Sequence, residues 1–170
     1  MIQEHDHEYR MGIGTDVHAF VEGKRLMLGG VYVPYPFGLK GHSDGDVAIH
    51  AVIDGILGAA GMGDIGTHFP DKDMKYKDAD SKGLLVDIRE KLAEKHWEIV
   101  NIDLTIHAEL PRLEPFKAQI KQCISSLLVM DFAAMNVKAK TSEGLGYVGR
   151  GEGIAATAAV LIRRKYRRML

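Results

Sequence analysis

Two hydrophobic periodicities stand next to each other near the middle of the chain, and they constrain its fold more than any other feature. In residues 81–95 the apolar side chains recur every three or four positions, which is the spacing of one face of an α-helix. In residues 100–107 apolar residues alternate strictly with polar ones, as in a strand that is buried on one face only. A chain that carries both patterns in succession is predicted to have a mixed α/β fold.

Helical spacing also occurs in two other segments of the chain. Residues 46–60 and 111–128 have apolar positions three and four apart, and Ser43 and Asp44 are available as caps for the first of these helices. Residues 154–162 are ambiguous, because their alanines favour a helix while the Val-Leu-Ile sequence at their end favours a strand.

Further strands are predicted on both sides of the helical segments. Residues 11–20 read as a strand with glycine kinks, and residues 137–141 read as a short strand. Residues 26–33 form an apolar pair of segments divided by Gly29-Gly30, which predicts a hairpin with a two-residue turn.

Length and charge limit the class of protein. The chain has 170 residues, which is the size of a single domain, and a net charge of −1. This near-neutral balance argues against a protein that mainly coats nucleic acid or an anionic membrane, although it permits a small phosphorylated ligand. Cys123 is the one cysteine, so an intrachain disulfide is impossible and the chain suits a reducing compartment.

The ends of the chain carry no targeting signal that we recognise. No apolar run reaches the ~20 residues of a membrane span, and the first residues lack the apolar stretch of a secretory signal. We therefore expect a soluble, cytoplasmic protein. Residues 1–9 are expected to be a disordered extension, residues 10–166 a single domain and residues 167–170 the end of a basic tail.

Histidine and aspartate spacing suggests a metal site. Asp16 and His18 lie two positions apart in a predicted strand, so their side chains point from the same face. His50 on the following helix can complete an Asp/His/His set, and Asp46 or Asp54, each four residues from it, can hold its other ring nitrogen. Three protein ligands with an open fourth position are typical of a catalytic zinc site. On spacing alone, a chance Asp-x-His pair and a partly buried helix histidine remain an alternative.

The turn at residues 41–46, with the sequence Gly-His-Ser-Asp-Gly-Asp, is a second candidate site. A polar turn before a helix presents free N–H groups that bind anions. Capping alone would explain Ser43 and Asp44. It would not explain His42, whose imidazole can donate to a phosphoryl oxygen.

Two loops add further candidates. Residues 63–73 carry three carboxylates, which are good acceptors for sugar or polyol hydroxyls, although a solvated surface loop is an equal alternative. Residues 138–153 combine Thr, Ser and many glycines, which can cradle phosphate, with Glu143, which can hold Mg²⁺. Neither the Walker spacing nor the dinucleotide-binding fingerprint is present.

Four blocks of the sequence together resemble the 2-C-methyl-D-erythritol 2,4-cyclodiphosphate synthase family of the non-mevalonate route to isoprenoids and terpenoids. The blocks are residues 10–18, residues 41–50, residues 63–71 and residues 143–153. The resemblance implies a phosphorus–oxygen lyase that converts 4-diphosphocytidyl-2-C-methyl-D-erythritol 2-phosphate into the 2,4-cyclodiphosphate and releases CMP. In that reaction the 2-phosphate attacks the β-phosphorus, which demands alignment and charge neutralisation more than a covalent nucleophile.

The resemblance also implies roles for individual residues. The metal ligands and catalytic residues would be Asp16, His18 and His50 for Zn²⁺, Glu143 for Mg²⁺ or Mn²⁺, and His42 and Thr141 as transition-state stabilisers. The substrate would be bound by Asp16, His18, His42, Ser43, Asp64, Ile65, Gly66, Phe69, Pro70, Asp71, Lys72, Asp73, Ala108, Pro111, Arg112, Lys140, Thr141, Ser142, Glu143, Tyr147 and Arg150. Arg112 stands where the family commonly has lysine, and its fork is expected to retain diphosphate binding with altered geometry. Lys140 stands where threonine is also common.

The implied fold is of the α+β type, with a mixed four-stranded sheet, helices on one face and a small hairpin, and it makes residues 154–162 a strand. The implied assembly is a homotrimer with active sites between subunits and an axial apolar channel for an isoprenoid diphosphate, whose polar end would match Arg150 and Glu152. Two rivals remain: a non-catalytic sensor with structural zinc, and a metal-dependent phosphohydrolase. The open coordination position and Glu143 argue against the sensor.

Overall fold

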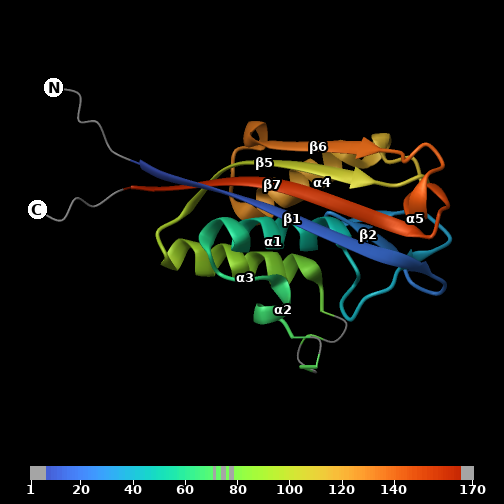
Figure 1. The fold of residues 1–170 in the computed structure, drawn as a ribbon, viewed down its shortest axis with the longest axis horizontal. Coiled ribbons are helices and arrows are strands. Elements are labelled where there is room, and N and C mark those ends of the chain that lie inside the picture. The colour runs from blue at the N-terminus through green and yellow to red at the C-terminus, as the bar shows by residue number, and fades with distance from the viewer. Residues whose placement is uncertain (1–6, 71, 74–75, 77–78, 166–170) are drawn as a thin grey trace, which may run out of the picture.

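Five strands form one mixed sheet in the computed structural model of the chain, which describes residues 7–70, 72, 73, 76 and 79–165 (Figure 1). Their order across the sheet is β4-β1-β7-β5-β6. The strands are β1 (His7–Val21), β4 (Gly38–Leu39), β5 (Glu98–His107), β6 (Met135–Lys140) and β7 (Gly153–Lys165). Neighbouring strands are antiparallel except β5 and β6, which are parallel. The α+β class is therefore confirmed.

The expected number of four strands is wrong, because β4 adds a fifth at the edge of the sheet. This strand pairs with Phe20 and Val21 at the end of β1. Two residues are too few to show an alternating pattern, so the sequence carries no signal for β4. The expected hairpin is confirmed as β2 (Leu26–Leu28) and β3 (Val31–Val33), which pair apart from the main sheet.

The ambiguous segment 154–162 lies inside β7, as the family resemblance implied. Ala156 and Ala158 of this strand are buried. The helix α1 (Val47–Ala60) packs closely on them, since a Cβ added to its Gly55 would lie 2.7 Å from a methyl group of Val160. The alanines therefore reflect close packing of a helix on the sheet and not helix formation by the segment itself.

The predicted helices over residues 81–95 and 111–128 are present as α3 (Ser81–Glu94) and α4 (Lys117–Leu128). Two short helices, α2 (Ile65–His68) and α5 (Gly146–Gly149), lie in segments that the sequence predicts to be loops. The segment 111–128 becomes helical only at Lys117, because its first part is loop and a 3-10 turn over Glu114–Phe116 that holds Pro115. Within the described part of the chain, no helix combines the length and the apolar character that crossing a bilayer requires.

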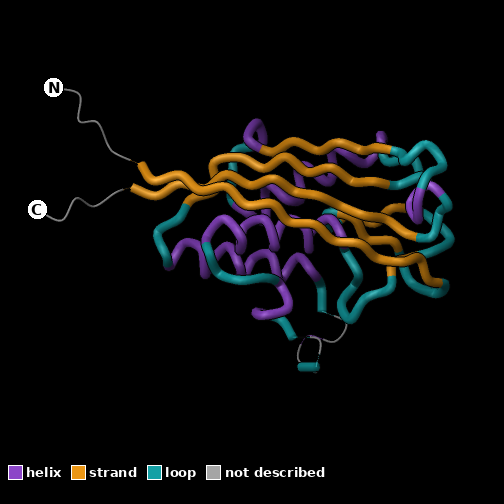
Figure 2. The backbone as a smooth tube through the Cα atoms, in the orientation of Figure 1, coloured by secondary structure: helices purple, strands orange, loops and turns teal. Residues whose placement is uncertain are grey.

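The helices α1 and α4 pack on one face of the sheet, and α3 packs against these two helices (Figure 1). Figure 2 shows the same arrangement by type of secondary structure. Along β5, Ile102, Leu104 and Ile106 point to that face and are fully buried, or nearly so. Along β1, the same face carries Gly12 and Gly14, and a Cβ at either position would overlap the backbone of α1. The absent side chains let α1 lie directly against β1. This contact sets where β1 and α1 present their polar residues to each other.

The two ends of the sheet-forming chain lie side by side, where His7 of β1 pairs with Lys165 of β7 (Figure 1). Residues 7–9 therefore belong to the sheet, which corrects the expectation that the domain begins three residues later. The remainder of the expected extension, residues 1–6, and the expected tail, residues 167–170, lie outside the described residues.

Candidate metal centre and substrate pocket

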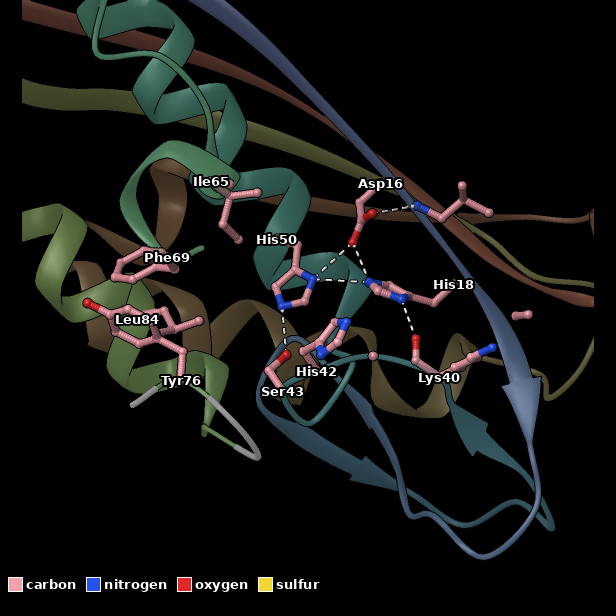
Figure 3. Close-up of a pocket in the computed structure, with 14 residues that line it drawn as sticks. Asp16, His18, Lys40, His42, Ser43, His50, Ile65, Phe69, Tyr76 and Leu84 are labelled. Carbon is pink, nitrogen blue, oxygen red and sulfur yellow. Dashed lines mark hydrogen bonds and ion pairs between the residues drawn. The ribbon is translucent and has the colours of Figure 1, made fainter. Parts of the chain in front are cut away.

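Three side chains from β1 and α1 converge on one point (Figure 3). His18 Nε2 lies 2.8 Å and His50 Nδ1 3.0 Å from Asp16 Oδ2. The two imidazole nitrogens are 3.2 Å apart. One ligand atom from each residue lies within 4.8 Å of the others, so the cluster predicted from spacing is present.

Local structure explains why these side chains meet. Asp16 and His18 share the helix-facing side of β1 because strand residues alternate between faces. His50 lies in the first turn of α1, whose N-cap is the fully buried Asp46. Ser43 and Asp44, the predicted caps, do not cap this helix. The Asp46 carboxylate accepts the N–H groups of the first turn and also those of Gly29-Gly30, so the start of α1 is tied to the hairpin.

The outer nitrogens of both histidines are also hydrogen-bonded. His18 Nδ1 contacts the backbone carbonyl of Lys40. His50 Nε2 lies 3.0 Å from Ser81 Oγ and 3.2 Å from Ser43 Oγ. The expectation that Asp46 or Asp54 holds this nitrogen is wrong, because Asp46 is occupied at the cap and Asp54 accepts the N–H of Ile65 at 2.7 Å.

The electrostatics of the cluster favour a cation. Burial alone would raise the pKa of Asp16, but hydrogen bonds from His18 and His50 outweigh it and hold this pKa well below its ordinary value. Burial alone would lower the pKa of His18, but the Asp16 carboxylate and the Lys40 carbonyl raise it. The three ligand atoms, from one ionised carboxylate and two imidazoles, face one point. The outer nitrogen of each imidazole is hydrogen-bonded, so this donor set fits a divalent metal ion.

A cavity of about 580 Å³ is lined on one side by Asp16, His18 and His50, the three candidate ligands that we call the metal cluster. The other side chains lining it include His42, Ser43, Ile65, Gly66, Phe69, Tyr76 and Leu84. In Figure 3 the apolar members of this set gather on one side of the cavity and the polar members on the other. The cavity thus offers a polar end beside the candidate metal ligands and an apolar floor a short distance away.

The loop at residues 63–73 meets this cavity only in part. Asp64 is the N-cap of α2, and its Oδ1 accepts hydrogen bonds from the N–H and the hydroxyl of Thr67. Pro70, Lys72 and Asp73 are exposed and are not among the lining residues. Asp71 lies outside the described residues.

The predicted nucleotide-binding residues lie elsewhere in the chain. Thr141 Oγ1 donates to Glu143 Oε1 at 2.6 Å, and Ser142 N donates to Glu109 Oε2 at 3.0 Å. The last carbonyl of β6, that of Lys140, accepts the N–H of Ala108, so the 108–112 loop lies beside this one. None of these residues lines the cavity that holds the metal cluster.

Ser142 and Tyr147 line a second cavity, of about 490 Å³, over the opposite face of the sheet. Arg150 and Glu152 are exposed nearby and form an ion pair at 2.6 Å. Within one chain, therefore, the structure groups the metal cluster with the 42–43 turn and the 65–69 segment. The 141–150 loop contributes to the second cavity instead, and Asp16 is the one candidate ligand among the described residues that lines both cavities.

Sequence reasoning missed several residues around the cavity. Tyr76 and Leu84 line it, and Ser81 holds His50 from behind. Ser81 was recognised only as the start of a helix. The one signal available was the polar pair Asp80-Ser81 at that start, which looks the same as an ordinary helix cap.

Solved structures of similar fold are known. The chain superimposes on the bifunctional IspDF from Campylobacter jejuni with a TM-score of 0.90 and 45% identity, covering 94% of this chain and 43% of that one. It superimposes on an IspF–CDP complex from Plasmodium falciparum with a TM-score of 0.81 and 35% identity, covering 93% and 97% of the two chains. The fold therefore places the chain in the IspF structural class, and its Asp/His/His cluster fits a metal-dependent enzyme.

Sequence comparison identifies the family. The YgbB family model matches residues 9–163, and the chain belongs to this family. It is 52% identical over 156 residues to the 2-C-methyl-D-erythritol 2,4-cyclodiphosphate synthase of Bordetella petrii, covering 92% of this chain and 96% of the relative. It is 54% identical over 155 residues to the synthase of Methylobacillus flagellatus, covering 91% and 97%. The family predicted from the four sequence blocks is confirmed.

Proposed function

We propose that the 2-C-methyl-D-erythritol 2,4-cyclodiphosphate synthase activity of this chain proceeds by direct displacement at phosphorus in the cavity beside Asp16, His18 and His50. An oxygen of the substrate's 2-phosphate forms a bond to the β-phosphorus of the diphosphate. The bond from that phosphorus to the bridging oxygen breaks, and CMP leaves with that oxygen. The observation that carries this proposal is the convergence of three ligand atoms on one point of a cavity wall.

The cluster is proposed to hold Zn²⁺ through Asp16 Oδ2, His18 Nε2 and His50 Nδ1, the three atoms that face one another. When bound, zinc polarises a phosphoryl oxygen and neutralises charge. The protein's part is to keep these atoms in place, which the backbone carbonyl of Lys40 and the serines behind His50 do from outside.

Charge that develops on the phosphoryl oxygens is proposed to be met by His42 and Thr141. His42 lines the cavity, and its turn is held by Lys24, whose Nζ donates to the Gly41 carbonyl at 3.0 Å. Thr141 is exposed beside Glu143, to which its hydroxyl donates. Both side chains can therefore reach a ligand outside the body of their own chain.

The methylerythritol unit is proposed to lie over Ile65, Phe69 and Leu84, because its branched carbon skeleton suits an apolar floor. Ser43, Asp64 and Gly66 border this region and supply polar contacts to its hydroxyls and 2-phosphate. Phe69 is buried and packs edge-on against Tyr76, with ring centroids 5.2 Å apart, so the position of its ring is fixed.

The cytidine end is proposed to be bound by Ala108, Pro111 and Arg112 together with the 140–143 loop. The CDP complex of the Plasmodium falciparum relative supports a cytidine nucleotide as part of the substrate. Glu143 is proposed to hold Mg²⁺ or Mn²⁺, which would neutralise phosphate charge. Its exposed carboxylate and its oxygen chemistry fit such an ion.

A homotrimer with active sites between subunits explains why one chain keeps the metal cluster and the 140–143 loop apart. The outer face of β1 supports this assembly, because Met11 is 67%, Ile13 62% and Val17 52% exposed. A row of exposed apolar side chains indicates a surface that another subunit covers. Arg150 and Glu152 would then lie at the polar end of an axial channel for an isoprenoid diphosphate.

We place the protein in the cytoplasm because its one cysteine suits a reducing compartment.

Phosphorus NMR of the products, combined with metal analysis, tests this function. The wild-type chain is expected to form a cyclic diphosphate and CMP, whereas inorganic phosphate would indicate a hydrolase and no product a sensor. His50→Ala is expected to lose zinc and turnover while keeping most of the fold, and native turnover in this variant would contradict the ligand assignment. Glu143→Gln is expected to weaken the Mg²⁺ dependence, and an unchanged Mg²⁺ titration would count against its role.

A further inference from the structure

We propose that Ser81 and Asp44 are positioning residues that hold the proton of His50 on Nε2 when its Nδ1 binds the metal. This inference rests on the proposed metal centre and adds two residues that are not among its ligands. Its basis is a continuous series of hydrogen bonds that runs from the Asp44 carboxylate through the Ser81 hydroxyl to the His50 ring.

The orientation of His50 defines what the ring must do. Its Nδ1 faces Asp16 Oδ2 at 3.0 Å and His18 Nε2 at 3.2 Å, so Nδ1 is the nitrogen on the metal side (Figure 3). A nitrogen that binds a metal must offer its lone pair and carry no proton. The proton of the neutral ring therefore has to lie on Nε2, which points away from the cluster towards Ser81 Oγ.

The partners of Ser81 determine the direction of its hydrogen bonds. Its Oγ lies 2.5 Å from Asp44 Oδ1, and its backbone N donates to Asp44 Oδ2 at 3.2 Å. An ionised carboxylate only accepts hydrogen bonds, so the single hydroxyl proton of Ser81 goes to Asp44. What remains on Oγ is a lone pair, which accepts the Nε2–H of His50. If the neutral ring carried its proton on Nδ1, Nε2 would have only a lone pair, and this would face the lone pair of Ser81 Oγ.

Ser43, the other hydroxyl near His50, does not impose this direction. Its Oγ lies 3.2 Å from His50 Nε2 and accepts the N–H of Gly45 at 3.3 Å. Neither contact forces the Ser43 hydroxyl to accept from His50, since the hydroxyl proton remains available for a lone pair on Nε2. The carboxylate behind Ser81 is what distinguishes the two serines.

The relay is also rigidly placed. Ser81 is fully buried as the first residue of α3, and its side chain has a single rotatable carbon–carbon bond. Asp44 is held against the same helix start, because its backbone N donates to the Ala79 carbonyl at 3.1 Å. The turn before α1 and the start of α3 are therefore clamped together, with the Ser81 hydroxyl between them and His50.

Two measurements on the full-length chain test the proposal. The first is zinc affinity by competition with a chelator. The second is the Nε2–H resonance of His50 in the zinc-bound protein, whose ¹H and ¹⁵N chemical shifts report the hydrogen bond to Ser81. The variants are Ser81→Ala, which removes the relay atom, and Asp44→Asn, whose amide can donate to Ser81 and so no longer imposes a direction. Ser81→Thr keeps the hydroxyl.

Ser125→Ala is the matched control, because Ser125 is equally buried but its hydroxyl donates only to the Lys121 carbonyl of its own helix. We expect Ser81→Ala and Asp44→Asn to bind zinc about 10-fold to 100-fold more weakly. In both, the Nε2–H resonance of zinc-bound His50 is expected to move or broaden, because the Ser81 hydroxyl is removed or is no longer held as an acceptor. Ser125→Ala is expected to change neither quantity, and Ser81→Thr to restore part of the affinity.

The outcomes separate this inference from the metal centre on which it rests. Wild-type protein that binds zinc no better than His50→Ala overturns the metal centre. Normal wild-type binding, with unchanged zinc affinity and an unchanged Nε2–H resonance in Ser81→Ala and Asp44→Asn, overturns only the relay. If neither variant folds, the zinc-bound wild-type protein decides, because an Nε2–H of His50 that exchanges with water as freely as an unbonded imidazole N–H contradicts the proposal directly.

Discussion

His50 Nδ1 lies 3.0 Å from Asp16 Oδ2, although the two residues are 34 positions apart in the chain and belong to a helix and a strand. The contact forms because Gly14 on β1 lets α1 lie directly against the strand. A packing feature of the backbone thus brings a carboxylate and an imidazole together as candidate ligands of one ion.

Asp16→Asn is expected to abolish zinc binding. Loss of a residue that only hydrogen-bonds a metal ligand costs about 10- to 100-fold in activity, and we expect turnover to fall by more than this when the ligand itself is lost. The amide removes the negative charge that two imidazoles share. Metal analysis and product formation measure the effect. Asp87→Asn, which breaks only a surface pair with Lys91, is the control, and equal losses in both variants would contradict the assignment.

Gly14→Ala is expected to lower the free energy of unfolding by at least about 1–3 kcal/mol, because its Cβ would lie 2.0 Å from the Ala51 carbonyl oxygen and force α1 off the sheet. Gly58→Ala in the same helix meets nothing within 4 Å and is expected to stabilise by about 0.5–1 kcal/mol. Urea unfolding of both variants measures the two values. A Gly14→Ala protein as stable as wild type would show that the contact is not tight.

Asp46→Asn is expected to cost about 1–3 kcal/mol of unfolding free energy. Both carboxylate oxygens of Asp46 accept backbone N–H groups, from the first turn of α1 and from Gly29 and Gly30, and an amide would turn a donor towards one of these donors. Asp80→Asn at the exposed cap of α3 is the control, because asparagine caps a helix as well as aspartate does. Equal stability of the two variants in urea would contradict the role of Asp46 in joining helix and hairpin.

Asp54→Asn is expected to change how stability depends on pH. Burial raises the pKa of Asp54 despite the N–H of Ile65, so the folded protein holds this proton more tightly than the unfolded chain, whose value is about 3.9. The contribution of the group is therefore largest below about pH 4 and is lost as the pH rises through the folded pKa. Relative to wild type, the variant should become more stable between about pH 4 and 7 in urea unfolding.

Asp103→Asn is expected to change the pH dependence of stability in the opposite direction. The hydrogen bond from Lys138 holds the pKa of Asp103 below its ordinary value, so its contribution is present above about pH 4 and is lost as the pH falls. The stability deficit of its variant relative to wild type should therefore be constant above about pH 4 and should shrink as the pH falls below that value. The same pH trend in both variants would refute the assignment for Asp54.

The sequence by itself determined the local half of this site. Strand periodicity puts Asp16 and His18 on one face of β1, and helical periodicity places His50 at the start of a helix that packs on the sheet. Both follow from backbone geometry over a few residues, which is why spacing could suggest the cluster, although the family resemblance was needed to choose it over a chance pairing. The shared sequence blocks predicted the family for the same reason, because each block is a short continuous motif.

Only the tertiary structure decided which groups hydrogen-bond to those ligands and which predicted site residues lie away from them. Ser81 reaches His50 across 31 positions, and the carboxylates that looked closest along the helix bind backbone N–H groups instead. The 141–143 loop lies outside the metal cavity of its own chain. Periodicity records which face of an element is apolar, whereas these partnerships depend on how distant elements pack, and no local pattern encodes that.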